Sequence, residues 1–180
     1  RFQAMADLFR GYSRDYEFDW LLIAAQAYQE SRLVQSQRSP AGAVGVMQLL
    51  PSTAKAPPIS IPNIEELDAN VHAGHKYLRH IADHYFDDPE IDELNRHLFS
   101  FAAYNAGPTR ISRLRREAAR RGLDPNQWFG VVERVVAEKV GMEPVTYVRN
   151  IFKYYVTYKL MQDSEHALRS TDPAPATEAP

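Results

Sequence analysis

The stretch from Leu67 to Tyr85 places apolar residues at alternating intervals of four and three, and this spacing constrains the fold strongly. Residues three or four apart share one face of an α-helix, so the pattern predicts a long amphipathic helix. The same reasoning predicts further helices at residues 19–31, 98–106, 108–122 and 131–140, and one after Pro144. No segment shows a strong period-two alternation typical of a strand. We therefore expect an all-α fold.

Glycine and proline predict where the helices are interrupted. Residues 39–45 read Ser-Pro-Ala-Gly-Ala-Val-Gly, which favours a loop, and the apolar run 46–50 favours a short helix after it. Prolines 51, 57, 58 and 62 predict an irregular connector. We expect residues 1–162 to form a single domain and residues 163–180, which end in a Pro/Ala/Thr-rich stretch, to form a disordered tail.

Composition limits the class of protein. Of the 180 residues, 44% are hydrophobic and 24% are charged, which suits a compact domain with a sizeable core. The 21 basic and 23 acidic side chains nearly cancel, so no overall positive field is available to hold nucleic acid. The absence of cysteine excludes disulfides, thiolate zinc sites and cysteine nucleophiles.

Neither a membrane helix nor a signal segment is evident in the sequence. The longest apolar run, residues 20–25, is far shorter than the roughly 20 residues that a membrane helix requires. Because the first residue is Arg1 rather than methionine, we expect the chain to be processed or excised from a longer protein.

Glu30 is the first candidate for chemistry, because it lies on the stripe that helix 19–31 must bury. It follows Ala27 by three residues and Ile23 by seven, so its carboxylate shares their face. A carboxyl group removed from water without a cationic partner has a raised pKa, which keeps a glutamate protonated as a general acid. The alternative from position alone is a helix-end glutamate at the rim of the core.

Several short segments then occur in a characteristic order. They are Glu30-Ser31, the loop 39–48 ending in Gly-Val-Met-Gln, Leu-Pro-Ser-Thr-Ala at 50–54, Ala-Ala-Tyr-Asn-Ala-Gly at 102–107, and Tyr147-Val148. Over roughly residues 19–160 the chain resembles the lysozyme-like lytic transglycosylases. The context Tyr-Gln-Glu-Ser at 28–31 resembles the membrane-bound type F members, whose catalytic module follows a regulatory module.

The resemblance implies a lysozyme-like fold with a glycan-binding cleft and a single catalytic acid. The implied reaction cleaves the β-1,4 bond between N-acetylmuramic acid and N-acetylglucosamine in peptidoglycan and leaves a 1,6-anhydromuramic end. Glu30 would protonate the leaving oxygen and then, as carboxylate, take the proton of the C6 hydroxyl. The 2-acetamido group would stabilise the oxocarbenium centre, so neither a second carboxylate nor a cofactor is expected.

The resemblance also implies a set of substrate-binding residues. They are Ser31, Ser39, Gly45, Met47, Gln48, Tyr104, Asn105 and Tyr147. Taken alone, the loop residues are also typical of turn glycines and a solvated glutamine, and the serines of helix caps and turns. Tyr147 is equally compatible with an aromatic core, whereas the resemblance assigns its hydroxyl to holding Glu30.

Two other patterns offer weaker hypotheses. His80 and His84 lie four apart on one helix, but no third metal ligand is evident, so no metal site is expected. Six arginines between Arg110 and Arg121 form a basic face that favours a solvated surface over an anionic partner.

Rival functions therefore stay open at this point. A hydrolytic lysozyme-like muramidase, a non-catalytic peptidoglycan-binding module and a nucleic-acid-binding helical module each account for some of these features. The resemblance favours peptidoglycan glycan strands as the partner rather than nucleic acid. It further implies a bacterial periplasmic location, associated with the outer membrane through a portion absent from this chain.

Overall fold

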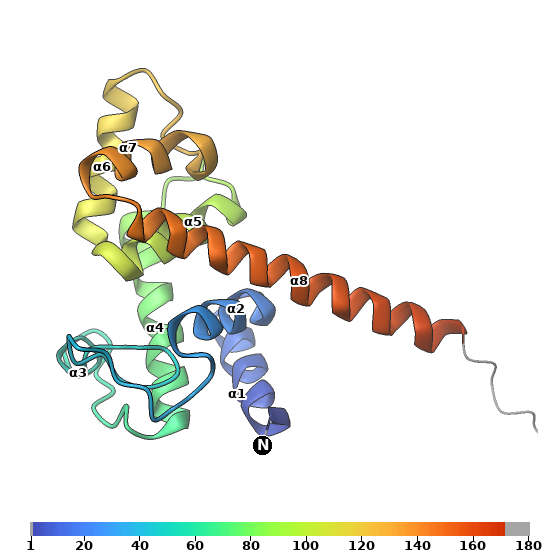
Figure 1. Cartoon of the computed structure of the whole chain (residues 1–180). Helices are drawn as coiled ribbons and strands as arrows, with labels where there is room; N and C mark the ends of the chain where they lie inside the picture. The colour runs from blue at the N-terminus through green and yellow to red at the C-terminus, as the bar shows by residue number, and fades with distance from the viewer. Residues whose placement is uncertain (1, 172–180) are drawn as a thin grey trace, which may run out of the picture.

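The computed structural model of the chain describes residues 2–171, which form a helical body from which one long helix projects (Figure 1). The elements are α1 (Phe2–Asp15), α2 (Trp20–Ser31), α3 (Pro51–Lys55), α4 (Leu67–Tyr85), α5 (Glu93–Ala106), α6 (Pro108–Arg120), the π-type turn η1 (Trp128–Val132), α7 (Glu133–Lys139) and α8 (Glu143–Thr171). Within residues 2–171 no strand forms, and only isolated bridges join Val44 to Arg38 and Leu49. The predicted all-α fold is confirmed.

Helix α5 is the centre of the core and contacts α4, α6 and α8. It begins after Asp92, whose carboxylate accepts a hydrogen bond from the N–H of Asn95 and so satisfies a free donor of the first turn. It ends at Gly107, whose φ of +97° is rarely adopted by other residues, and Pro108 starts α6 directly. All side chains from Leu98 to Ala103 are buried, so this part of α5 is packed within the core.

Helix α2 packs most extensively against α8, and this contact places Glu30. Asp19 caps the start of α2 by accepting from the N–H of Leu21, and it also accepts from the hydroxyl of Tyr155 on α8. The helix ends at Ser31 because Arg32 adopts a left-handed conformation, with φ +54°. Glu30 therefore lies in the last turn of α2.

The segment 32–50, here called the loop 32–50, covers a second, smaller hydrophobic cluster of Val44, Leu49, Ala54, Ile59, Ile64 and Ala73. Asn70, fully buried on α4, accepts from the N–H of Met47 and donates to the carbonyls of Val44 and Ile64, at 2.8, 2.8 and 2.9 Å. Buried backbone groups outside regular structure need such partners. Asn70 therefore fixes the loop to α4.

The short helix predicted at residues 46–50 is wrong. Residues 45–48 form turns, and the helix begins at Pro51, which was expected in an irregular connector. Val46, Met47 and Leu49 are buried because the loop folds over the core, not because a helix presents them. A short apolar run does not distinguish these two reasons for burial.

Two helical regions at the chain ends were not predicted. In α1, the buried side chains are Ala6, Phe9 and Ser13, and Ser13 hydrogen-bonds to His75 of α4. Because Ser13 is polar, it interrupts the apolar pattern from which a helix is predicted. At the other end, α8 continues through residues 163–171, which corrects the expectation of a disordered tail from residue 163. Leucine, glutamate, alanine and arginine in this stretch favour helix even when exposed. Residues 172–180 of the predicted tail lie outside the described residues.

None of the helices within residues 2–171 combines the length and apolar character needed to cross a membrane.

Replacing Asn70 by alanine is expected to weaken the fold, because three buried backbone groups then lose their partners. We expect the free energy of unfolding, measured by urea denaturation, to fall by about 3 kcal/mol. The matched control is Asn63→Ala, at an exposed position, with an expected change below about 0.5 kcal/mol. Equal stabilities of the two variants would contradict an anchoring role for Asn70.

Candidate active site

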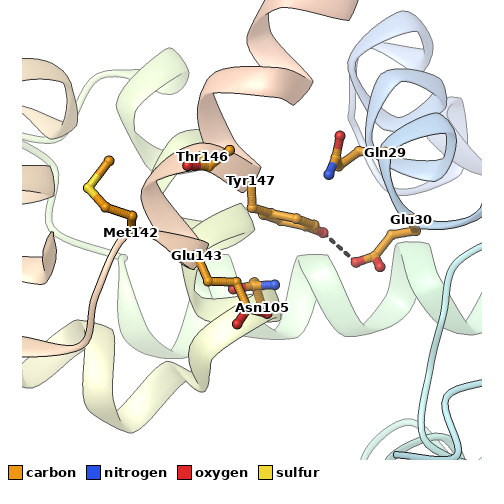
Figure 2. A pocket seen from close by; sticks show the side chains of 7 residues that line it. All are labelled: Gln29, Glu30, Asn105, Met142, Glu143, Thr146 and Tyr147. Carbon is orange, nitrogen blue, oxygen red and sulfur yellow. Dashed lines mark hydrogen bonds between the residues drawn. The ribbon is translucent and has the colours of Figure 1, made fainter. Parts of the chain in front are cut away.

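Glu30 lines an open pocket of about 430 Å³ where α2, the end of α5 and the start of α8 meet (Figure 2). The pocket is lined by Gln29, Glu30, Asn105, Met142, Glu143, Thr146 and Tyr147. Glu30 and Gln29 come from the last turn of α2, Asn105 from the last turn of α5, and the others from the start of α8 and the residue before it. Three helix ends therefore bring these residues together.

The hydroxyl of Tyr147 holds Glu30 in place. It donates a hydrogen bond of 2.6 Å to Glu30 Oε1, as drawn in Figure 2, and accepts one of 3.0 Å from Nε2 of Gln26. Tyr147 is buried, with 5% of its surface exposed, and so its ring is fixed by packing. Within the described residues no cationic side chain pairs with Glu30, whose other oxygen, Oε2, makes no hydrogen bond there.

Burial raises the pKa of Glu30 to about 7, while the hydrogen bond from Tyr147 opposes this rise. Desolvation disfavours the charged carboxylate, and a hydrogen bond to that form favours it. Burial and the nearby Glu30 also raise the pKa values of Tyr104 and Tyr147 well above their usual value, so both phenols stay neutral. Near neutral pH, Glu30 is therefore able both to give and to take a proton.

Comparison with known sequences decides the family. The sequence profile described as the Transglycosylase SLT domain matches residues 7–126. The chain belongs to this family. The predicted membership of the lysozyme-like transglycosylases is thus confirmed. The start of α8, including Tyr147, lies beyond the matched residues.

Relatives of this SLT domain include proteins named membrane-bound lytic murein transglycosylase F. The one from Marinobacter nauticus is 35% identical over 161 residues, which is 82% of this chain and 31% of that protein. The one from Vibrio campbellii is 36% identical over 161 residues, or 82% of this chain and 29% of that protein. The chain thus spans about a third of the length of these relatives.

A solved structure shares the fold of this SLT domain. It is that of an inactive mutant of lytic transglycosylase Slt from Pseudomonas aeruginosa, with a TM-score of 0.63 and 24% identity. The match covers 87% of this chain and 24% of that one.

Of the predicted site residues, the SLT domain brings Glu30, Asn105 and Tyr147 together in the pocket. Ser31 and Tyr104 do not line it and instead support the loop 32–50. The Ser31 hydroxyl donates to the carbonyl of Val46 at 2.8 Å, and the Tyr104 hydroxyl to that of Met47 at 2.6 Å. These two residues therefore fix the position of the loop relative to Glu30.

The remaining predicted residues belong to the loop 32–50 itself and do not line this pocket. Ser39 accepts from the N–H of Ala43, and Gln48 donates to the carbonyl of Gly45 at 2.8 Å. At Gly45, φ is +80° and a Cβ would lie 2.4 Å from the amide nitrogen of Asn70, so only glycine fits. Met47 is buried beneath the loop. Contact of these residues with a glycan stays a prediction.

Four lining residues, Gln29, Met142, Glu143 and Thr146, were missed by the sequence prediction. Glu143 lies four residues before Tyr147, so helical spacing places both on one face of α8 and could have indicated it. Glu143 gives the pocket a second carboxyl group, outside the motifs that carry the resemblance.

The basic face of α6 is partly engaged within the domain. Arg115 pairs with Asp88 at 3.1 Å, and Arg121 pairs with Glu117 and Glu138 at 3.0 and 2.8 Å. His80 and His84 stack with ring centroids 5.3 Å apart, and residues 2–171 hold no cluster of three potential metal ligands.

The raised pKa of Glu30 predicts a pH-dependent cost to stability. The pKa of Glu30 is about 7 in the folded domain, compared with 4.5 in an unfolded chain, so the folded state binds this proton more tightly. The stabilisation that results is fully present below pH 4.5 and is lost as pH rises through 7. Between these values the wild type should lose about 3 kcal/mol in its free energy of unfolding that Glu30→Gln does not lose. Thermal or urea unfolding of both proteins at pH 4.5 and pH 8 measures this difference, and parallel pH profiles would contradict it.

Proposed function

We propose that this chain is the catalytic domain of a peptidoglycan lytic transglycosylase with Glu30 as its only catalytic acid and base. The observation that carries the proposal is the Glu30 carboxyl group, desolvated, hydrogen-bonded by Tyr147 and facing an open pocket. Family membership and the names of the relatives, which are lytic murein transglycosylases, support the substrate class.

The proposed reaction uses one carboxyl group twice, first as an acid and then as a base. Protonated Glu30 gives its hydrogen to the oxygen that joins N-acetylmuramic acid to N-acetylglucosamine, and the bond from that oxygen to C1 breaks. The 2-acetamido group stabilises the positive charge at C1. Glu30, now a carboxylate, takes the proton of the C6 hydroxyl, whose oxygen bonds to C1 and closes the 1,6-anhydro ring. No water is consumed, and Glu30 ends protonated.

The pKa of Glu30 suits both halves of this cycle, since a general acid–base group works best when its pKa lies near the working pH. The open pocket suits a polymer that enters from the side. Asn105, Gln48 and Ser39 offer amide and hydroxyl groups that match sugar hydroxyl and acetamido groups, with Gly45 and Met47 shaping the loop beside them.

Glu143 favours a second candidate reaction, hydrolysis by a muramidase. A second carboxyl group in the pocket would take a proton from a water molecule, and the oxygen of that water would then bond to C1 in place of the C6 oxygen. The product then carries a reducing end rather than an anhydro ring.

For the wider protein, we propose a periplasmic enzyme that acts on glycan strands near the outer membrane. The relatives are named membrane-bound, and most of their length lies outside the match. A regulatory module in that remaining length is part of the proposal. We also propose that the enzyme binds no nucleic acid and requires no cofactor.

Mass spectrometry of the products released from purified peptidoglycan tests the reaction. We expect anhydro products, lighter by one water than hydrolytic muropeptides, from the wild type and from Glu143→Gln, and none from Glu30→Gln. Glutamine keeps the shape of Glu30 but cannot exchange the proton. Reducing-end products that disappear with Glu143→Gln would establish the hydrolase instead, and turnover by Glu30→Gln would exclude the proposed role of Glu30.

The Tyr147 hydroxyl should set the alkaline limit of activity. Because its hydrogen bond lowers the pKa of Glu30, Tyr147→Phe should raise that pKa further and keep Glu30 protonated to higher pH. The alkaline limb of the pH–rate profile should therefore move upward, while the maximal rate falls about tenfold because Glu30 is less well held. Tyr154→Phe is the control, since its hydroxyl contacts Arg32 outside the pocket. Identical profiles for both variants would contradict this role.

A further inference from the structure

Gln26 is a buried polar residue one helical turn before Glu30 on α2, and its side chain is 0% exposed. Its Nε2 donates to the Tyr147 hydroxyl at 3.0 Å. Its Oε1 is buried and has no hydrogen-bond partner among the described residues. An unpaired buried oxygen costs stability that an apolar side chain of similar size would not. A glutamine at this position therefore calls for a reason other than stability.

The geometry of the hydroxyl supplies that reason. Tyr147 has one proton to donate, and its oxygen lies 3.0 Å from Gln26 Nε2 and 2.6 Å from Glu30 Oε1. Because Gln26 places an N–H against this oxygen, the single proton of Tyr147 points to Glu30. If the amide were rotated, two acceptor oxygens would compete for that proton.

The direction of this chain of hydrogen bonds decides where the acidic hydrogen of Glu30 resides. Oε1 is occupied as an acceptor by Tyr147, so the protonated carboxyl group carries its hydrogen on Oε2. Oε2 makes no hydrogen bond within residues 2–171, and it is the oxygen left to reach a substrate.

We propose that Gln26 is a positioning residue, which fixes the direction of the Tyr147 hydroxyl and thereby keeps the transferable proton of Glu30 on Oε2. Its effect on rate rests on the proposed function, whereas its effect on the carboxyl group of Glu30 does not.

Gln26 is uncharged, and this makes its influence separable from that of the ionisable neighbours of Glu30. Those neighbours are Tyr147 and Glu143 on α8 and Tyr104 on α5. Hydrogen bonds in a chain polarise one another, so an N–H donated to the phenol oxygen makes its O–H a stronger donor to Glu30. Loss of Gln26 should weaken that donation and raise the pKa of Glu30 without altering any charge.

The experiment is a double-mutant cycle of Gln26→Met and Tyr147→Phe in this chain. Methionine is close to glutamine in size but has no N–H donor, and Gln26→Leu serves as a second apolar replacement if Gln26→Met does not fold. Three quantities are measured for each variant: the melting temperature, the pKa of Glu30 by carbon-13 NMR without substrate, and the rate of product release from peptidoglycan.

We expect Gln26→Met to melt at or above the wild-type temperature, to show a raised Glu30 pKa, and to lose about tenfold in rate. In the Tyr147→Phe background, Gln26→Met should change neither the Glu30 pKa nor the rate, because its influence passes through the missing hydroxyl.

An unchanged Glu30 pKa in Gln26→Met, or effects that add fully to those of Tyr147→Phe, would overturn the proposal. So would a loss of rate that merely follows a loss of folded protein. If the wild type releases no product while Gln26→Met still shifts the Glu30 pKa through Tyr147, the proposed function fails and the role of Gln26 stands.

Discussion

The hydrogen bond between Tyr147 and Glu30 joins α8 to the last turn of α2, and the rest of the site is arranged around it. It depends on the extensive packing of α2 against α8, which brings together residues 117 positions apart. Burial and this hydrogen bond act on Glu30 in opposite directions, and burial is the larger effect. The packing of α2 against α8 thus influences the pKa of the Glu30 carboxyl group.

A second set of constraints holds the loop 32–50 beside that carboxyl group. Asn70 binds backbone groups of the loop from α4, Ser31 from α2 and Tyr104 from α5. Each of these polar side chains is directed at backbone rather than at the pocket. Residues that the family motifs mark as important therefore include some that line the pocket, such as Glu30 and Asn105, and others that fix the loop 32–50, such as Ser31 and Tyr104.

The pocket itself combines a desolvated acid with a neighbour of the same type. Glu143 is exposed, whereas Glu30 is desolvated, so the two carboxyl groups occupy different environments in one pocket. Desolvation raises the pKa of Glu30 to about 7, so this carboxyl group is able to hold a proton near neutral pH. The buried polar pair of Gln26 and Tyr147 then gives the acid a defined orientation.

The sequence by itself determined the spans of several central helices, since Leu67–Tyr85 and the stop at Gly107-Pro108 follow from local periodicity and backbone preference. It also determined that Glu30 lies on the inner face of α2. Only the tertiary structure decided that residues 45–48 form turns rather than part of a helix, and that Glu143 lines the pocket beside Glu30. The physical reason is that helix formation depends on residues close together in the sequence. Burial and hydrogen-bond partners depend instead on segments that are far apart in the chain.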